Sequence, residues 1–260
     1  GLVPLGSIGM GVFALWLGTG AATSFAQSAA AGAKKVIRFG AAEMVSPKAT
    51  VSIYQQIIYY VSEQLGMPVE MVQRRTSAEM NALFKNQQVD FAFIGAGPYV
   101  ESRAEFGAAL IAAPQVGGEK ACYAYLIVPK DSPVTDLEGL QGRAFAFSDP
   151  VSNAGYLFPL YSLALKGQTP DMFFKRTIFS GNHEASIKLV AQGAVDGAFV
   201  NQVFWDYLNA ADPEDTSKTR IIYKSSPFGM IPVVAHPAVD PQLKKKVQTI
   251  LLNMHKDPDG

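Results

Sequence analysis

The sequence predicts an α/β protein built of two similar lobes, and three observations support this prediction. From residue 34 onward, short apolar runs typical of buried strands alternate with segments whose apolar residues recur at helical spacing. A phrase that closes a helix and opens a buried strand occurs twice, as QQVDFAF at residues 87–93 and as QGAVDGAF at residues 192–199. The apolar run ACYAYLIV at residues 121–128 is long enough to pass from one lobe into the other.

The first round of elements has the pattern β-α-β-α-β. Its first helix carries apolar side chains at helical spacing and is closed by Gly66-Met67-Pro68. Its second helix opens on Thr76-Ser77-Ala78-Glu79, an N-cap residue followed by an acidic first turn. The predicted elements are, in order, a strand at 36–40, a helix at 51–65, a strand at 69–72, a helix at 76–86 and a strand at 89–94.

The second round repeats this alternation and sets the lobe boundaries. The predicted strands are at 144–147, 173–179, 195–200, 221–223 and 231–235, and the predicted helices are at 152–166, 184–192, 201–210 and 241–255. We assign residues 34–124 and 226–260 to lobe 1 and residues 125–225 to lobe 2. The hinge between the lobes is expected near residues 125–128 and again near residues 223–226.

The first 33 residues are predicted to be a signal peptide and linker. Residues 8–25 are apolar and uncharged, and Ser24 and Ala26 occupy the small positions of an A-x-A-like cleavage site. A basic n-region is missing, and residues 1–7 are interpreted as a cloning remnant or a truncated start. The alternative is an uncleaved membrane anchor, for which the segment is barely long enough. In either case the folded part is expected in the periplasm or outside the cell.

Composition and charge exclude several classes of protein. The chain has 260 residues and is 48% hydrophobic, enough to bury the core of one large domain or of two smaller lobes. Lys plus Arg and Asp plus Glu are balanced at 22 each, which argues against a nucleic-acid-binding protein because such proteins carry a basic surplus or a basic face. Cys122 is the only cysteine, so an intrachain disulfide and a clustered-cysteine zinc site are excluded. We expect no cofactor and no metal ion.

Polar residues gather in a loop between a predicted strand and a predicted helix, at residues 149–159 (DPVSNAGYLFP). Free backbone N–H groups and the helix dipole make a helix N-terminus favourable for an anion. Ser152 and Asn153 add side-chain donors there. The alternative is an ordinary Ser/Asn N-cap.

Three further loops have the same position relative to the predicted strands. His183, in SGNHEAS at residues 180–186, can donate to an anion, or can serve as a cap or a packed residue. Tyr99 follows Gly-Ala-Gly-Pro, whose glycines permit close approach of the backbone. Ser46 precedes Pro47 in a loop that is otherwise a plain turn and cap. Loops at the carboxyl ends of successive strands form the ligand crevice of an α/β sheet.

The motifs VDFAFIG, FSDPVSNAGYLFP, FSGNHEAS and VDGAFVN, in this order, resemble the phosphate/phosphite/phosphonate substrate-binding proteins of ABC importers. The resemblance extends over residues 36–260 and implies the type II periplasmic-binding fold, with two α/β lobes joined by two crossover strands. It also implies that Ser152, Asn153 and His183 hold the phosphorus-bound oxygens. Tyr99 would contribute from the facing lobe, and so would Ser46 or its neighbours.

The sequence departs from the family pattern at several positions. Asn153 replaces the usual Ser or Thr, although an amide can still donate. Val203 and Ile231 align where aminophosphonate-binding members carry the acidic residues that hold the ligand amine. An ammonium group without a carboxylate would be poorly held in a closed cleft, so we expect phosphite, phosphate, methylphosphonate or an apolar-tailed phosphonate. Family members continue past a D-P-D-G-like segment, so a shortened chain or a sensor domain of a longer protein is also considered.

Other functions were compared with the importer hypothesis. An enzyme is disfavoured because the three histidines are scattered, no G-x-S-x-G or P-loop motif is present, and Cys122 lies in an apolar strand. Asp90 and Asp196 head buried strands, where capping or ion pairing is expected rather than catalysis. A membrane-tethered sensor domain with the same fold, and an organic ligand, stay open at this stage.

The resemblance implies a mechanism and a set of partners. The ligand bridges the lobes, and the closed form is presented to the membrane partner. The expected partners are a small oxyanion or phosphonate and the permease subunits of an ABC transporter. The protein is expected to be a periplasmic monomer.

Overall fold

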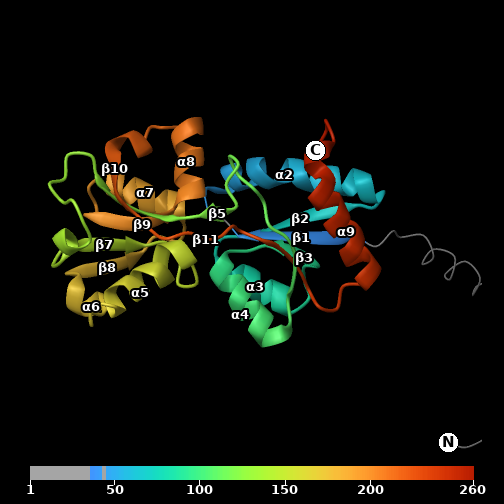
Figure 1. Ribbon diagram of the computed structural model, residues 1–260, viewed down its shortest axis with the longest axis horizontal. Helices are drawn as coiled ribbons and strands as arrows, with labels where there is room; N and C mark the ends of the chain where they lie inside the picture. Colours follow the sequence, from blue (N-terminus) through green and yellow to red (C-terminus); the bar gives the residue numbers. More distant parts are fainter. Residues whose placement is uncertain (1–35, 43–44) are drawn as a thin grey trace, which may run out of the picture. The chain divides into compact units, whose positions relative to one another are not determined.

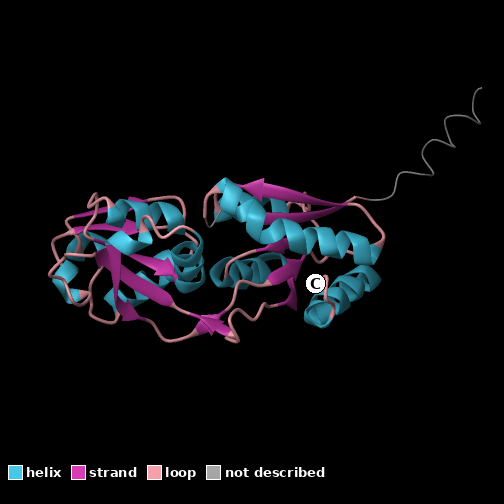
Figure 2. Ribbon diagram, turned by 90° about the horizontal axis from the view of Figure 1, so that it is seen from above, coloured by secondary structure: helices cyan, strands magenta, loops and turns pink. Residues whose placement is uncertain are grey.

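The computed structural model describes residues 36–42 and 45–260, and its folded unit is Val36–Gly260. Figures 1 and 2 show that this unit contains two groups of strands, each flanked by helices. The predicted signal peptide lies outside the described residues. No described helix combines the length and the apolar character that crossing a membrane requires.

Lobe 1 contains a five-stranded sheet with the order β2-β1-β3-β12-β4. Its strands are β1 (Ile37–Ala42), β2 (Val69–Arg74), β3 (Phe91–Phe93), β4 (Ala109–Ala112) and β12 (Val233–Ala235). Strand β1 is parallel to β2 and β3, and β12 is antiparallel to both of its neighbours. The helices are α2 (Pro47–Leu65), α3 (Ser77–Lys85), α4 (Ala96–Phe106) and α9 (Pro241–Asn253). Apolar side chains of α2 and α9 pack on one face of the sheet, and those of α3 and α4 pack on the other.

Lobe 2 contains a second five-stranded sheet with the order β10-β6-β9-β7-β8. Its strands are β6 (Ala124–Pro129), β7 (Ala144–Phe147), β8 (Arg176–Phe179), β9 (Gly197–Asn201) and β10 (Thr219–Lys224). On one face lie the π-helical turn η2 (Asn153–Leu157), α5 (Phe158–Ala164) and α6 (Pro170–Phe173). On the other lie α7 (His183–Ala191) and α8 (Gln202–Ala211). The short 3₁₀ turns are η1 (Glu138–Leu140), η3 (Thr216–Lys218) and, in lobe 1, η4 (Met254–Lys256).

The two sheets are built on the same plan. Each has three parallel strands in the spatial order second, first, third, followed by an antiparallel strand and an edge strand. The antiparallel strand, β12 in lobe 1 and β6 in lobe 2, is the one that directly follows a passage of the chain between the lobes. The repeated sequence phrase therefore corresponds to a repeated structural unit.

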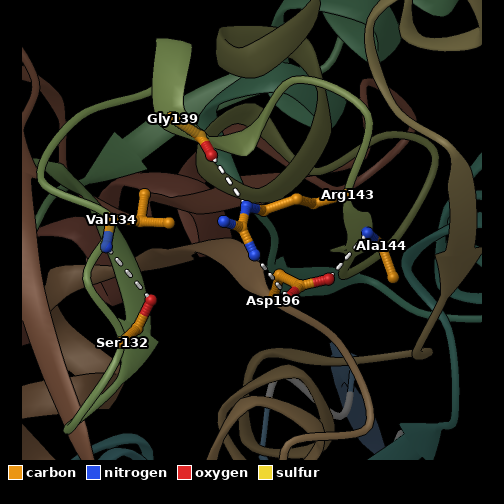
Figure 3. Close-up of polar contacts among 6 residues, drawn as sticks. All are labelled: Ser132, Val134, Gly139, Arg143, Ala144 and Asp196. Atoms are coloured by element: carbon orange, nitrogen blue, oxygen red, sulfur yellow. Dashed lines mark hydrogen bonds and ion pairs between the residues drawn. The ribbon is translucent and has the colours of Figure 1, made fainter.

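Asp90 and Asp196, the acidic residues of the two repeated phrases, occupy equivalent places. The Asp90 carboxylate accepts a hydrogen bond of 2.9 Å from the backbone N–H of Arg38, in β1. The Asp196 carboxylate accepts one of 2.9 Å from the backbone N–H of Ala144, at the start of β7. It also faces the guanidinium of Arg143 (Figure 3), and the two groups lie 3.5 Å apart. Both aspartates thus tie a third strand to a first strand, which is the capping and ion-pairing role that the sequence predicts.

The crossover between the lobes differs from the prediction. The apolar run at 121–128 is broken at Tyr123 into β5 (Ala121–Cys122) and β6, and β5 pairs with β11 (Phe228–Gly229) in a two-stranded antiparallel sheet of its own. Residues 125–128 lie inside the lobe 2 sheet, between β9 and β10, and their side chains are largely buried. A strand paired on both sides cannot bend freely. The crossovers therefore lie at β5 and β11, a few residues from the expected positions on each segment.

Two smaller differences have local causes. The predicted strand at 173–179 is shortened to β8 because Pro170 opens α6, which continues to Phe173. Strand β4 was not predicted, because its sequence ALIA carries no alternation and contains strong helix formers. The predicted helix at 152–166 begins with a π-helical turn before α5.

Candidate ligand-binding site

The site is formed by loops that follow the parallel strands of the two lobes. In lobe 1 the strands β1, β2 and β3 lead into the N-termini of α2, α3 and α4. In lobe 2 the strands β7, β8 and β9 lead into η2, α7 and α8. Because each loop ends at a helix N-terminus, it offers backbone N–H groups with no partner inside the helix. This arrangement concentrates hydrogen-bond donors between the lobes.

A pocket lies where loops from both lobes meet the crossover strands. Its volume is about 30 Å³, a few times the ~10–15 Å³ that one enclosed water needs, so it suits a ligand of a few heavy atoms. The lining comes from lobe 1 (Ser77, Gly95, Ala96, Pro98, Ile231), from lobe 2 (Ser148, Asp149, Ser152, Asn153, Ala154, Gly181, Asn182, His183, Asn201) and from the crossover (Cys122, Phe228, Gly229).

Ser152 and Asn153 lie together at the start of η2. The Ser152 Oγ accepts a hydrogen bond of 3.1 Å from the backbone N–H of Gly155, so it caps the turn as an N-cap serine does. A serine hydroxyl has one proton to donate, and capping does not use it. The Asn153 side chain has no hydrogen-bond partner among the described residues. Both side chains therefore keep donors available to a ligand.

His183 is the first residue of α7 and lines the same pocket. Its Nδ1 accepts a hydrogen bond of 3.3 Å from the backbone N–H of Asn201, so in the neutral ring the proton resides on Nε2. The Nε2 atom lies 3.5 Å from the Ser152 Oγ. The ring stacks on Phe204, with centroids 5.6 Å apart, which fixes its plane. His183 thus presents an N–H donor beside the Ser152 hydroxyl.

Burial determines the charge of His183. The side chain is buried, and removal from water lowers its pKa from 6.5 to about 4. The imidazole is therefore neutral at pH 7 in the ligand-free protein. It acts as an oriented dipolar donor and not as a fixed positive charge.

Helix α4 forms the wall contributed by lobe 1. Gly95 is its N-cap, and Gly95, Ala96 and Pro98 all line the pocket. At Gly97, a Cβ atom would lie only 2.8 Å from the carbonyl oxygen of Val151 in lobe 2. The first turn of α4 therefore packs directly against the loop that carries Ser152, and this close approach requires glycine.

The structure places Tyr99 and Ser46 outside the lining of the pocket. The Tyr99 hydroxyl accepts a hydrogen bond of 3.3 Å from Arg103 on the same helix, and its ring packs against the lobe 1 core. Ser46 lies at the start of α2, where its backbone N–H donates to the Glu184 carboxylate of lobe 2 at 2.6 Å. Of the residues named from sequence, the structure brings together Ser152, Asn153 and His183.

Among the residues that the structure describes, the lining holds one carboxylate and no lysine or arginine. That carboxylate belongs to Asp149, and both of its oxygens are occupied: Oδ1 accepts from the Val151 N–H at 2.9 Å and Oδ2 from the Ser77 N–H at 3.2 Å. Ile231 is in the lining and Val203 is not. An anion in this pocket would be held by neutral donors and helix N-termini, and a ligand ammonium would meet, among the described lining residues, one carboxylate that already accepts two backbone hydrogen bonds.

Sequence reasoning missed several lining residues. Asn201 is the last residue of β9 and orients His183 through its backbone N–H, a role that no side-chain pattern signals. Ser148 directly follows β7, and its buried Oγ has no hydrogen-bond partner among the described residues. Cys122 was expected to be an inert buried thiol; it is buried, and desolvation raises its pKa to about 11. Its place in the pocket wall depends on the pairing of β5 with β11, which the sequence did not indicate.

The chain has two α/β lobes of equivalent topology, which are joined by two crossover segments and enclose a small pocket lined by helix N-termini. This architecture defines the class of type II periplasmic binding proteins. Residues 39–260 match the family model described as ABC transporter, phosphonate, periplasmic substrate-binding protein. The chain belongs to this family, which confirms the predicted fold class and family. It is a periplasmic substrate-binding component of an ABC importer, and the family is not one of enzymes.

Individual relatives agree with this assignment. The chain is 27% identical over 232 residues, 87% of its length and 68% of the relative's, to the phosphonates-binding periplasmic protein of Escherichia coli (strain K12). It resembles the crystal structure of a binding protein component of an ABC phosphonate transporter from Pseudomonas aeruginosa, with a TM-score of 0.79 and 26% identity over 87% of this chain and 76% of that one. The fold is also that of PhnD1 from Prochlorococcus marinus (MIT 9301), solved in complex with methylphosphonate, with a TM-score of 0.78 and 22% identity over 86% and 87% of the two chains.

Proposed function

We propose that the pocket between the lobes binds a small phosphorus oxyanion, namely phosphite, phosphate or a simple phosphonate such as methylphosphonate. The observation that carries the proposal is the convergence of helical N-termini, among them those of α4, of the η2–α5 segment and of α7, on one pocket whose described lining residues include no lysine or arginine. Backbone N–H groups and helix dipoles are well suited to a compact anion. The pocket volume of about 30 Å³ supports a ligand of this size.

Each of three side chains has a role in this proposal. The Ser152 hydroxyl and the His183 Nε2–H, 3.5 Å apart, donate to oxygens of the ligand. The Asn153 amide, which has no other partner among the described residues, donates to another oxygen. Lobe 1 contributes the backbone around Gly95 and Ala96 at the start of α4. Tyr99 and Ser46 would support the site indirectly, through α4 and through the contact of Ser46 with Glu184.

The lining also favours a ligand without an amino group. Asp149, the carboxylate among the described lining residues, already accepts two backbone N–H groups, and Ile231 adds an apolar surface. An ammonium group would therefore have to share an engaged carboxylate, which offsets less of its desolvation cost than a free carboxylate would. The Prochlorococcus marinus relative solved with methylphosphonate is an example of a family member that takes such a ligand. Delivery of the ligand to permease subunits by a monomeric, closed receptor completes the proposed role.

A ligand panel tests the proposal. Thermal unfolding is measured with phosphite, phosphate, methylphosphonate, 2-aminoethylphosphonate and sulfate, each well above its dissociation constant. A ligand at about a hundred times its Kd adds roughly 2.7 kcal/mol, which corresponds to several degrees for a chain of this size. We expect such a shift with phosphite, phosphate or methylphosphonate.

Variants locate the site in the same assay. Ser152→Ala and His183→Ala should each lose most of the shift, because each removes a hydrogen-bond donor from a small buried site. A shift with 2-aminoethylphosphonate alone would contradict the proposed ligand class. A full shift in both variants would place the site elsewhere.

A further inference from the structure

Two hydrogen bonds between a carboxylate of lobe 2 and a backbone N–H of lobe 1 connect the lobes, one outside the pocket lining at Ser46 and one in the pocket wall at Ser77. The Glu184 Oε2 accepts from the backbone N–H of Ser46 at 2.6 Å, and the Asp149 Oδ2 accepts from the backbone N–H of Ser77 at 3.2 Å. Both donors lie at helix N-termini of lobe 1, Ser46 at the N-cap of α2 and Ser77 at the first position of α3. Each carboxylate therefore occupies the position of a capping group, supplied by the opposite lobe.

The helix that Glu184 contacts lacks a cap of its own. Ser46, the N-cap of α2, makes no side-chain capping hydrogen bond, and the first turn of α2 contains no acidic residue. A negative charge at such an N-terminus is stabilising, because the helix dipole and the unpaired N–H groups both favour it. Helix α3 has a full capping box between Thr76 and Glu79, and Asp149 takes an N–H that this box leaves free.

The acidic residues lie on the same loops as the proposed ligand donors. Glu184 directly follows His183, and Asp149 precedes Ser152 by three positions. The loop that carries Asp149 and Ser152 also packs against Gly97 of lobe 1. A rotation of one lobe away from the other would break both hydrogen bonds together with the Gly97 contact, so these bonds exist only when the lobes are closed.

We propose that Glu184 and Asp149 are positioning residues that hold the lobes closed and so slow the release of ligand, Glu184 from outside the pocket lining and Asp149 from the pocket wall. This inference rests on the proposed function for its ligand, but the interlobe contacts are independent of it. The ligand and the two carboxylates use different helix N-termini: the ligand those of α4, η2–α5 and α7, and the carboxylates those of α2 and α3. Each negative charge thus has its own group of donors.

Electrostatic repulsion alone predicts the opposite effect of these carboxylates on ligand affinity. Two carboxylates near an anion pocket repel an anionic ligand, so their removal should tighten binding if repulsion were their main effect. If they hold the closed form, their removal should weaken binding and act on the dissociation rate. The two effects are therefore separated by one measurement of affinity and rate.

The test uses Glu184, because Asp149 also caps its own loop through the Val151 N–H. Association and dissociation rates of methylphosphonate are measured by stopped flow for the wild type, Glu184→Ala and Glu184→Gln. We expect dissociation to be roughly five- to twentyfold faster in Glu184→Ala, the range that loss of a capping group gives, with association nearly unchanged. Glu184→Gln keeps an acceptor oxygen and should fall between the two. The control is Asp131→Asn, which removes one negative charge, as Glu184→Gln does, from an exposed turn of lobe 2. It should release methylphosphonate at the rate of the wild type.

A second readout does not depend on the ligand. Small-angle scattering of the ligand-free proteins should show a larger radius of gyration in Glu184→Ala, and thermal unfolding of the ligand-free variant confirms that it is folded. Equal or slower dissociation in Glu184→Ala would overturn the inference. If methylphosphonate does not bind the wild type, the proposed ligand is refuted, and scattering alone decides: superimposable curves for wild type and Glu184→Ala overturn the closing role.

Discussion

At the scale of single residues, burial of His183 has a consequence for stability that can be measured. Its pKa is lowered to about 4 by burial, whereas in the unfolded chain it is close to 6.5. Below pH 6.5 the unfolded state therefore binds a proton that the folded state binds only near pH 4. The stabilising contribution is complete above pH 6.5 and is lost as the pH falls toward 4.

The difference between the folded and unfolded pKa of His183 predicts that the free energy of unfolding depends on pH, and that replacing His183 removes this part of the dependence. Between pH 7.5 and pH 5, His183 should account for a loss of about 2 kcal/mol in the free energy of unfolding. Urea unfolding of the ligand-free wild type and of His183→Gln at both pH values measures it, because all other groups titrate in both proteins. Equal losses in the two proteins would mean that the ring is not held neutral by the fold.

Ser152 shows why the sequence predicts only some of the side chains that line this site. A serine at a strand-to-helix junction is consistent with capping and with ligand binding, and the structure assigns it the capping bond to Gly155 while leaving its proton free. Asn153 and His183 lie at junctions of the same kind. Local pattern identifies such junctions, but it cannot tell which of them face a common pocket. That selection excluded Tyr99 and Ser46 from the lining.

At the scale of elements, the helices and the parallel strands were predictable because their apolar spacing is long and regular. Strand β7 (Ala144–Phe147) has the predicted bounds, and α7 begins within a residue of its expected start. The break between β5 and β6 was not predictable, because it follows from the pairing of β5 with β11, more than a hundred residues away. The contacts of Glu184 and Asp149 with lobe 1 depend in the same way on which loops face one another.

The junction of β7 and η2 gives a prediction at this scale. A Cβ atom at Gly155 would lie 1.8 Å from the Ser148 Oγ and 2.7 Å from its Cβ, so rotating the hydroxyl away does not relieve the clash. Gly155→Ala should destabilise the ligand-free protein by about 1–3 kcal/mol, as overpacking does. Adding Ser148→Gly should recover most of this loss, apart from the ~1 kcal/mol that a new glycine costs in chain entropy.

A double-mutant cycle of urea unfolding measures the coupling between the two positions. Gly229→Ala is the matched control, because a Cβ atom there meets nothing within 4 Å and the change should be nearly neutral. Additive effects of Gly155→Ala and Ser148→Gly would show that the two residues do not compete for the same space.

At the scale of the whole molecule, the repeated lobe plan explains where the ligand-binding groups can lie. In both sheets the parallel strands end at the interlobe side, so every following helix presents its N-terminus there. Of the six helical N-termini, all but that of α2 contribute residues to the pocket lining, and those of α2 and α3 donate a backbone N–H to a carboxylate of the opposite lobe. Binding and closure therefore use the same physical interaction at neighbouring places.

Closure brings the first turn of α4 against the loop that carries Ser152, and the absence of a side chain at Gly97 permits this close approach. A Cβ atom there would lie 2.8 Å from the Val151 carbonyl oxygen and 3.1 Å from the Leu157 side chain, both in lobe 2. Within lobe 1 alone, alanine in place of glycine favours helix α4 by up to ~1 kcal/mol. Gly97→Ala should therefore leave the ligand-free protein as stable as the wild type or more stable, yet weaken methylphosphonate binding by at least tenfold.

Calorimetric titration and thermal unfolding of the same samples separate these two effects. Glu101→Ala, an exposed change on the same helix, is the control for altered helix propensity and should leave affinity unchanged. Loss of stability in ligand-free Gly97→Ala would mean that Gly97 is needed within lobe 1 itself. Unchanged affinity would mean that the bound state does not require the close approach of α4 to the Ser152 loop. The expected combination, stability kept and affinity lost, arises only if ligand binding and lobe closure are one event.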